Sequence, residues 1–275
     1  MQDPATAASI ALSLEPTCWE GLGTVSRMRD HSDKKLQDYI VLSHVLKDLF
    51  RKLRFVRERP GVIGYMLPGI VECMLRVAGT NLSFGSIFLL YYNVAASYIT
   101  GSSNPDEVAV KAQSLIVQDN PIWYYRALAI VKPSFIRRSK APLYPDLNDE
   151  VDVERFFRRG RSFYHLLRLN INDPVSREAV ESFVLTRRTY RDVMRRLECR
   201  IPCSSDIDYI HRRLASSRID FLVYRRAGFE RALELTRSKP LSERESMGSI
   251  ADLTVLTLYY YSLSCMKKWS CCMEC

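Results

Sequence analysis

The sequence predicts an all-α fold in a single compact multi-helix domain, and three observations lead to this prediction. Apolar residues recur at steps of three and four along most of the 275-residue chain, which is the period of an amphipathic helix. No segment alternates apolar and polar residues between hairpin turns. No fixed-period repeat or low-complexity linker divides the chain, so we expect one domain over residues 1–275.

Two long helices are predicted in the first half of the chain. Residues 36–53 place apolar side chains along one helical face. Residues 82–99 form an apolar run that approaches membrane-spanning length. The run contains three serines and an asparagine and lacks flanking anchor residues, so it predicts a buried core helix and no membrane association.

Prolines that follow a capping residue mark two further helix starts. Asn104 precedes Pro105, and Asp173 precedes Pro174. Residues 176–197 are then expected to form one amphipathic helix with a basic outer face. The arginines of that face are Arg187, Arg188, Arg191, Arg195 and Arg196. Such rows are usually solvated, and without aromatic platforms or a recognisable binding fold they do not favour nucleic-acid binding.

The last long helix is expected to start near Ser249. Ser249 can cap it, with Asp252 returning a hydrogen bond in a capping box before the apolar run 253–263. Alternatively, the turn at Gly248 exposes backbone N–H groups to a phosphate while the nearby carboxylate holds a metal ion or a ribose hydroxyl. The likeliest long loop is 134–149, which is rich in proline and basic residues and is a candidate lid or binding segment.

Composition indicates in which environment the protein works and which charge its ligands carry. A hydrophobic content of 47% suits a soluble globule, and 40 basic against 31 acidic residues give a net charge of +9 that attracts anions in general. The chain shows no basic region followed by a signal core, so we place it in the cytoplasm. Four cysteines fall in the last eleven residues, but they do not form a pair of C-x-x-C knuckles and no histidine accompanies them, which favours a reducible tail over a zinc site.

Five segments in fixed order carry a family resemblance. They are residues 15–27 ending in Gly21-Leu22-Gly23-Thr24-Val25-Ser26-Arg27, then Asn81-Leu82-Ser83-Phe84-Gly85, Asp119 through Tyr125-Arg126-Ala127-Leu128, residues 220–228, and residues 246–254. Together they resemble the motifs of the triphosphoribosyl-dephospho-CoA synthase family. The resemblance spans almost the entire chain and implies an all-α enzyme that prepares the prosthetic group of citrate or malonate lyase and decarboxylase carrier proteins.

Several polar positions depart from the family pattern. The family's lysine falls at Gly21 and its first proline pair at Glu20 and Leu22, while two polar residues of the second motif become Leu82 and Ser83. The asparagine and proline of the last motif become Ser246-Met247. Scaffold glycines and apolar positions persist, which is the pattern that a changed substrate or a lost activity would leave.

The resemblance also implies a reaction and its participants. A ribose hydroxyl of dephospho-CoA attacks the ribose anomeric carbon of ATP, adenine leaves, and the triphosphate is carried along. ATP is then a substrate, Mg²⁺ a cofactor, nucleotide and CoA-like molecules the small-molecule partners, and an acyl-carrier-type protein pathway the context. Such chemistry needs cationic or metal partners for the triphosphate, a carboxylate base, and exclusion of water.

Candidate residues follow from the matched motifs and from their chemistry. Arginine forks suit phosphate, hard carboxylate oxygens suit magnesium or the base role, and small polar groups suit sugar hydroxyls. In that order the candidates are Arg27 and Arg225, then Asp220 and Asp252, then Ser26, Asn81 and Ser83, with Ser249 in the turn expected to face a phosphate. The competing interpretations are a surface ion pair for each arginine, a helix-start cap for Asp220, and a local hydrogen-bonding role for His31 beside Asp30.

Three functional hypotheses remain open at this point. The first is a divergent transferase of the resembled family. The second is a non-catalytic relative that still binds a nucleotide or a protein, which the lost lysine and asparagines favour. The third, a nucleic-acid-binding helical protein, rests on charge alone.

Overall fold

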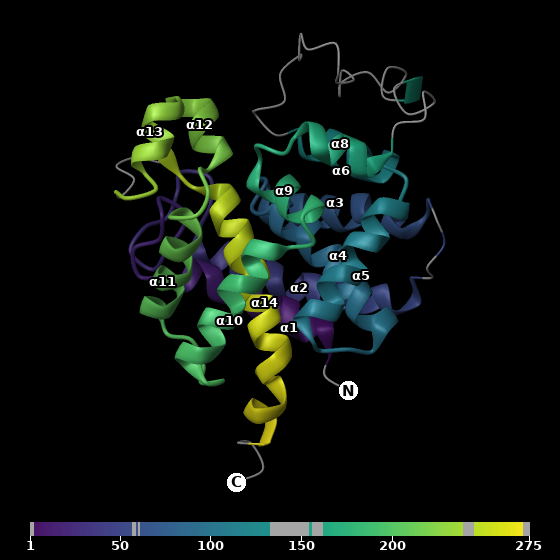
Figure 1. Ribbon diagram of the computed structural model, residues 1–275, viewed down its shortest axis with the longest axis horizontal. Coiled ribbons are helices and arrows are strands. Elements are labelled where there is room, and N and C mark those ends of the chain that lie inside the picture. The colour runs from purple at the N-terminus through teal and green to yellow at the C-terminus, as the bar shows by residue number, and fades with distance from the viewer. Residues whose placement is uncertain are drawn as a thin grey trace.

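The protein is all-helical in a computed structural model, which describes residues 3–56, 59, 61–132, 154–155, 162–238 and 245–271 (Figure 1). Every regular element within these ranges is an α-helix or a short 3-10 helix. The described helices surround one hydrophobic core, which confirms the predicted fold class. The predicted loop at 134–149 lies outside the described residues.

The helices follow in a simple order along the chain. They are α1 (Pro4–Leu14), η1 (Glu15–Thr17), α2 (Leu36–Lys52), η2 (Leu53–Phe55), η3 (Ile63–Met66), α3 (Leu67–Ala78), α4 (Phe84–Thr100), α5 (Pro105–Gln118), α6 (Ile122–Val131), α8 (Phe163–Leu169), α9 (Pro174–Val180), α10 (Val184–Leu197), α11 (Ser204–Ala215), α12 (Phe221–Ala227), α13 (Phe229–Glu234) and α14 (Gly248–Cys271). Figure 1 shows α14 running lengthwise between α10 and α11 on one side and α1 and α4 on the other.

Helices α4 and α14 form the middle of the core. The expectation of a buried core helix in place of a membrane span is met by α4, most of whose side chains are buried. No described helix is long and apolar enough to cross a membrane. Buried tyrosines of α14 satisfy their hydroxyls on α4, because Tyr260 donates to Asn93 Oδ1 at 2.7 Å and Tyr259 lies 2.7 Å from Ser97 Oγ. These bonds fix the register of the two helices, since an unpaired buried hydroxyl is costly.

The predicted caps at two helix starts are confirmed. Asn104 accepts a hydrogen bond from the N–H of Asp106 at the start of α5. Asp173 accepts one from the N–H of Ser176 at the start of α9. Both starts carry proline in the first turn, where the missing N–H has no intrahelical partner.

The expectation of one continuous helix over 176–197 is wrong. The chain breaks between α9 and α10, where Ser182 and Phe183 take positive φ angles of 54° and 58°. The buried carboxylate of Glu178 accepts the N–H groups of Leu185 and Thr186 at 3.1 and 2.9 Å, so it caps the second helix. The side-chain periodicity continues across this break, and for that reason periodicity alone could not reveal it.

The basic face of α10 is engaged within the chain. Arg187 and Arg191 both donate to Asp106 on α5. Arg195 pairs with Asp192. Each of these three guanidinium groups thus has a carboxylate partner within the chain, and Arg187 and Arg191 share one.

One cysteine expected in a reducible tail lies in the core instead. Cys265 is fully buried in α14 and forms a disulfide with Cys199, 66 residues earlier. The bond fastens the end of α10 to the central helix. Cys272 and Cys275 lie outside the described residues.

Candidate functional site

A cavity of about 1030 Å³ opens where the amino-terminal ends of four helices meet. Residues from the first turns of α4, α9, α12 and α14 line it, together with the segment between η1 and α2. Helix amino termini carry a partial positive charge, so their convergence suits an anionic ligand, although side chains cap N–H groups at each of these starts. An aromatic wall completes the lining with Phe84, Phe88, Tyr124 and Tyr125.

Asp252 bridges the starts of α14 and α4 at this cavity. Its Oδ1 accepts the N–H of Ser86 at 2.8 Å and the Ser86 hydroxyl at 2.5 Å. The contact is possible only because residue 85 is glycine, since a Cβ at Gly85 would lie 2.1 Å from Asp252 Oδ2. The capping box expected between Ser249 and Asp252 is therefore wrong, because both residues lie inside α14 and Asp252 bonds to α4 instead.

The environment of Asp252 makes it a weaker acid than an ordinary aspartate. Burial raises the pKa of Asp252 to about 7, the Ser86 hydrogen bonds oppose that rise, and the negative charges of Asp173 and Glu15 add to it. A carboxyl group with such a pKa exchanges protons near neutral pH. This is the property required of a general acid or base.

Asp173 is a second carboxylate at the cavity, and the sequence indicated only its role as a helix cap. Its Oδ2 accepts the N–H and the hydroxyl of Ser176, and its Oδ1 accepts the Ser249 hydroxyl at 3.4 Å. Burial raises its pKa as well. Its charge in turn raises the pKa of both Asp220 and Asp252. The pattern of aspartate before proline marks a helix start, and nothing in it signals that this start faces a ligand cavity.

Asp220 lies behind the cavity wall and is not among the lining residues. Its Oδ1 accepts the N–H groups of Leu222 and Val223 at the start of α12, and its Oδ2 accepts that of Ile250 in α14. The helix-start role considered for it is thereby confirmed. Burial raises the pKa of Asp220 to about 6, against the lowering effect of these backbone hydrogen bonds.

The eight sequence candidates separate into two groups. Asp252, Asn81, Ser83, Ser249 and Arg225 line the cavity. Asp220, Ser26 and Arg27 are not lining residues.

The segment that carries Ser26 and Arg27 reaches the cavity through other residues. Ser26 is buried, and its hydroxyl accepts the N–H of Met28. Arg27 is exposed and donates to the hydroxyl of Ser204 on α11 at 3.2 Å. Thr24 and His31 of the same segment line the cavity instead. His31 Nε2 lies 2.7 Å from the carbonyl of Gly23, the local hydrogen-bonding role considered for it.

The cavity is lined by charges of both signs. Basic side chains come from the segment before α2, the end of α6 and α12, and they are Lys34, Lys132, Arg225 and Arg226. Acidic side chains come from Glu15, Asp33, Asp173 and Asp252. A ligand that carries phosphates together with exchangeable hydroxyls would find partners for both kinds of group.

Two lining residues carry buried hydroxyls without partners in the described part of the chain. These are Ser83 Oγ at the cap of α4 and Thr24 Oγ1 in the segment after η1. Asn81 precedes the same cap and accepts the N–H of Phe84 at 3.1 Å. Unsatisfied hydroxyls are uncommon in protein interiors, and beside a cavity they indicate a place for polar ligand atoms.

Comparisons with known proteins identify a family and a similar fold. Residues 1–271 match the family of ATP:dephospho-CoA triphosphoribosyl transferases, CitG. A crystal structure from Archaeoglobus fulgidus, of a protein described provisionally as a triphosphoribosyl-dephospho-CoA synthase, has a similar fold with a TM-score of 0.61 and 16% identity. The match covers 81% of this chain and 97% of that one. No curated protein matches. The chain therefore belongs to the ATP:dephospho-CoA triphosphoribosyl transferase family.

Proposed function

We propose that the protein transfers the triphosphoribosyl group of ATP to a ribose hydroxyl of dephospho-CoA and releases adenine. Family membership supports the reaction class. The single structural observation that carries the proposal is Asp252, a cavity carboxylate whose pKa of about 7 fits a general base. A divergent acceptor that presents a similar hydroxyl is compatible with the same chemistry.

The proposed step conserves atoms and charge. Ionised Asp252 accepts the proton of the attacking hydroxyl, whose oxygen forms a bond to the anomeric carbon of ATP while the bond from that carbon to adenine breaks. The leaving adenine takes up a proton from the solvent or from a neighbouring acid. Asp173, on the same wall, would stabilise positive charge that develops on the ribose ring.

The triphosphate requires positive partners, and the cavity supplies them. Arg225 and Arg226 on α12 provide guanidinium forks, while Lys34 and Lys132 provide point charges from other elements. The converging helix amino termini add the positive ends of their dipoles. Asn81, Ser83 and Ser249 would bind sugar hydroxyls or phosphate oxygens. The aromatic wall would exclude water and hold the purine.

The donors of the cavity fit Mg²⁺ when a substrate phosphate completes its coordination. In the described part of the chain the partners of Asp173 and Asp252 are hydroxyl and N–H groups. Mg²⁺ commonly takes one or two carboxylates together with phosphate oxygens. When bound, the ion would neutralise phosphate charge. Asp173 would hold it in place of Asp220, because Asp173 lines the cavity and Asp220 does not.

The alternative of a non-catalytic relative rests on the position of the family's lysine. That position is Gly21, which has a φ of 63° and whose Cβ would lie 3.1 Å from Thr24 Oγ1. A lysine at Gly21 would be strained in this loop, so the structure accommodates the loss of that cation. The alternative predicts nucleotide binding without turnover, seen as thermal stabilisation by ATP with no adenine released.

The test is adenine release from ATP in the presence of dephospho-CoA and Mg²⁺. Wild type should release adenine and Asp252→Asn should lose most of that rate. Arg225→Ala should raise the KM for ATP, whereas Arg27→Ala, outside the cavity lining, should leave it near the wild-type value. Stabilisation by ATP without adenine would favour the non-catalytic alternative, and equal effects of the two arginine variants would argue against this cavity.

Two wider expectations accompany the proposal. The use of ATP is consistent with a cytoplasmic protein. The product would serve as the precursor of the prosthetic group of an acyl-carrier-type protein, as the resembled family implies.

A further inference from the structure

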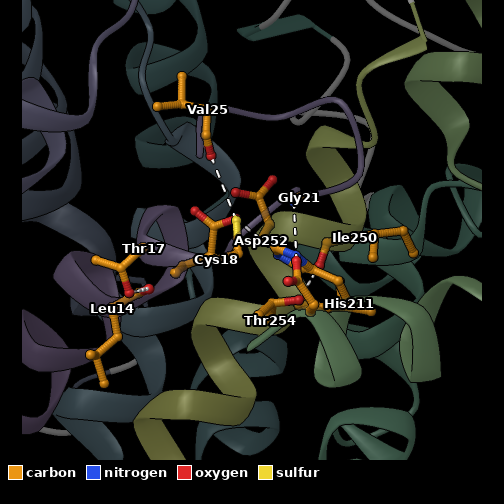
Figure 2. A network of polar contacts seen from close by, with 12 residues as sticks. Leu14, Thr17, Cys18, Gly21, Val25, His211, Ile250, Asp252 and Thr254 are labelled. Carbon is orange, nitrogen blue, oxygen red and sulfur yellow. Dashed lines mark hydrogen bonds and ion pairs between the residues drawn. The ribbon is translucent and has the colours of Figure 1, made fainter. Parts of the chain in front are cut away.

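A cluster of three metal-binding residue types lies between η1 and α11, and none of its members lines the cavity. Cys18, Asp208 and His211 each offer one ligand atom, and these three atoms lie within 4.8 Å of one another. Cys18 and His211 are buried, and Asp208 is partly buried. Figure 2 shows Cys18 and His211 close together, with the Cys18 sulfur directed toward the Val25 carbonyl.

The donor atoms of this cluster are incompletely used within the chain. His211 Nδ1 has no hydrogen-bond partner in the described part of the chain, although the side chain is only 1% exposed. Its Nε2 lies 3.0 Å from Glu15 Oε1. When Nε2 donates to Glu15, the Nδ1 of the neutral imidazole presents a lone pair.

The side chains of Cys18 and Asp208 can also still bind a metal ion. The contact from Cys18 Sγ to the Val25 carbonyl is long, at 3.9 Å. Asp208 accepts the N–H groups of Trp19, Glu20 and Gly21, which occupies three of the roughly four acceptor sites of a carboxylate.

We propose that Cys18, Asp208 and His211 bind a zinc ion. Sulfur, nitrogen and carboxylate ligands are those that Zn²⁺ takes in proteins, with water able to fill a fourth position. Glu15 would act on His211 as the supporting carboxylate that orients ligand histidines by accepting their second N–H. On binding, the thiol proton of Cys18 passes to the solvent and a sulfur–zinc bond forms.

The zinc ion would fasten the segment after η1 to α11. Asp208 and His211 come from α11, and Cys18 opens the segment that supplies Thr24 and His31 to the cavity. Asp208 already holds the backbone of residues 19–21. A metal here would order one wall of the cavity without itself contacting substrate, and its presence is independent of the proposed transferase activity.

Cobalt provides the direct probe, because a thiolate bound to Co²⁺ gives a charge-transfer absorption band in the near ultraviolet. The full-length protein is stripped with a chelator and titrated with Co²⁺, then with Zn²⁺ in competition. One equivalent should bind, and Cys18→Ser should lose the band while keeping its helical circular dichroism. Cys73→Ser, a partly buried cysteine of α3, should keep the band. So should a variant with Cys272 and Cys275 changed to serine.

A second variant tests the supporting role of Glu15. Glu15→Gln should weaken Zn²⁺ binding about 10–100-fold while the thiolate band remains at saturation. A band that survives Cys18→Ser, or that disappears with the tail cysteines, would overturn the assignment. So would the absence of any band in the folded wild type.

Discussion

Replacing Asp252 by asparagine should stabilise the protein at neutral and alkaline pH while removing most of its activity. Burial raises the pKa of this carboxyl from an ordinary 3.8 to about 7, so the folded state disfavours the charged form. A group whose pKa is raised by folding contributes its full stability below the unfolded pKa and loses it as pH rises through the folded pKa. The stability that wild type draws from Asp252 is therefore lost between about pH 4 and 7.

The magnitude follows from the difference between these two pKa values. It corresponds to about 4 kcal/mol as an upper limit, because each pKa unit represents about 1.36 kcal/mol. Asparagine keeps an oxygen that can accept from Ser86, and it carries no charge. The variant should thus become more stable relative to wild type as pH rises from 4 to 8.

Urea unfolding of both proteins across this pH range measures the difference directly, and the contributions of groups that do not interact with Asp252 cancel. Asp206→Asn is a matched control of opposite sign. Burial acts to raise the pKa of Asp206, but hydrogen bonds from Arg200 and Cys203 outweigh it and lower that pKa overall. Its stability contribution is present above pH 4 and is lost in acid, so this variant should be destabilised at neutral pH. A difference between Asp252→Asn and wild type that does not change with pH would refute the reasoning.

Two further predictions concern the contacts that build the site and the core. Gly85→Ala should lower the free energy of unfolding by about 1–3 kcal/mol and impair activity, because the added Cβ would overlap the carboxylate of Asp252. Gly69→Ala, where the added Cβ meets open space, should raise it by about 0.5–1 kcal/mol. Thermal unfolding of both variants tests this, and equal effects would contradict it. Replacing Cys199 by serine should remove about 4 kcal/mol under oxidising conditions, the loop-closure value for a bond to Cys265 across 66 residues. The loss should disappear in excess dithiothreitol, and a loss unaffected by reduction would show that the bond contributes nothing.

Much of the fold was predictable because helical periodicity and capping residues act locally. The core helix within 82–99 and the caps at Asn104 and Asp173 follow from such local patterns. The break at Ser182 does not follow from a local pattern, since it depends on Glu178 capping the next helix across the turn. A contact of that kind leaves no periodic trace in the sequence.

The candidate site was only partly predictable, because motifs identify residues without fixing the side of a helix they face. Asp252 and Arg225 were named and line the cavity, whereas Asp220 and Arg27 belong to matched segments but turn elsewhere. Asp173 was assigned to a helix cap alone, and only packing reveals that this cap faces the ligand cavity. The cluster at Cys18 was equally hidden, since its partners lie about 190 residues away in the sequence.

The pH dependence of adenine release tests the central claim that Asp252 is the base of a transferase site. With ATP and dephospho-CoA at low concentration, kcat/KM should rise with pH up to about 7 and then level, following ionisation of this carboxyl. In Asp252→Asn the residual rate should be low and should lack that rise. A wild-type rate that is flat across the neutral range, or an asparagine variant that retains the rise, would contradict the account.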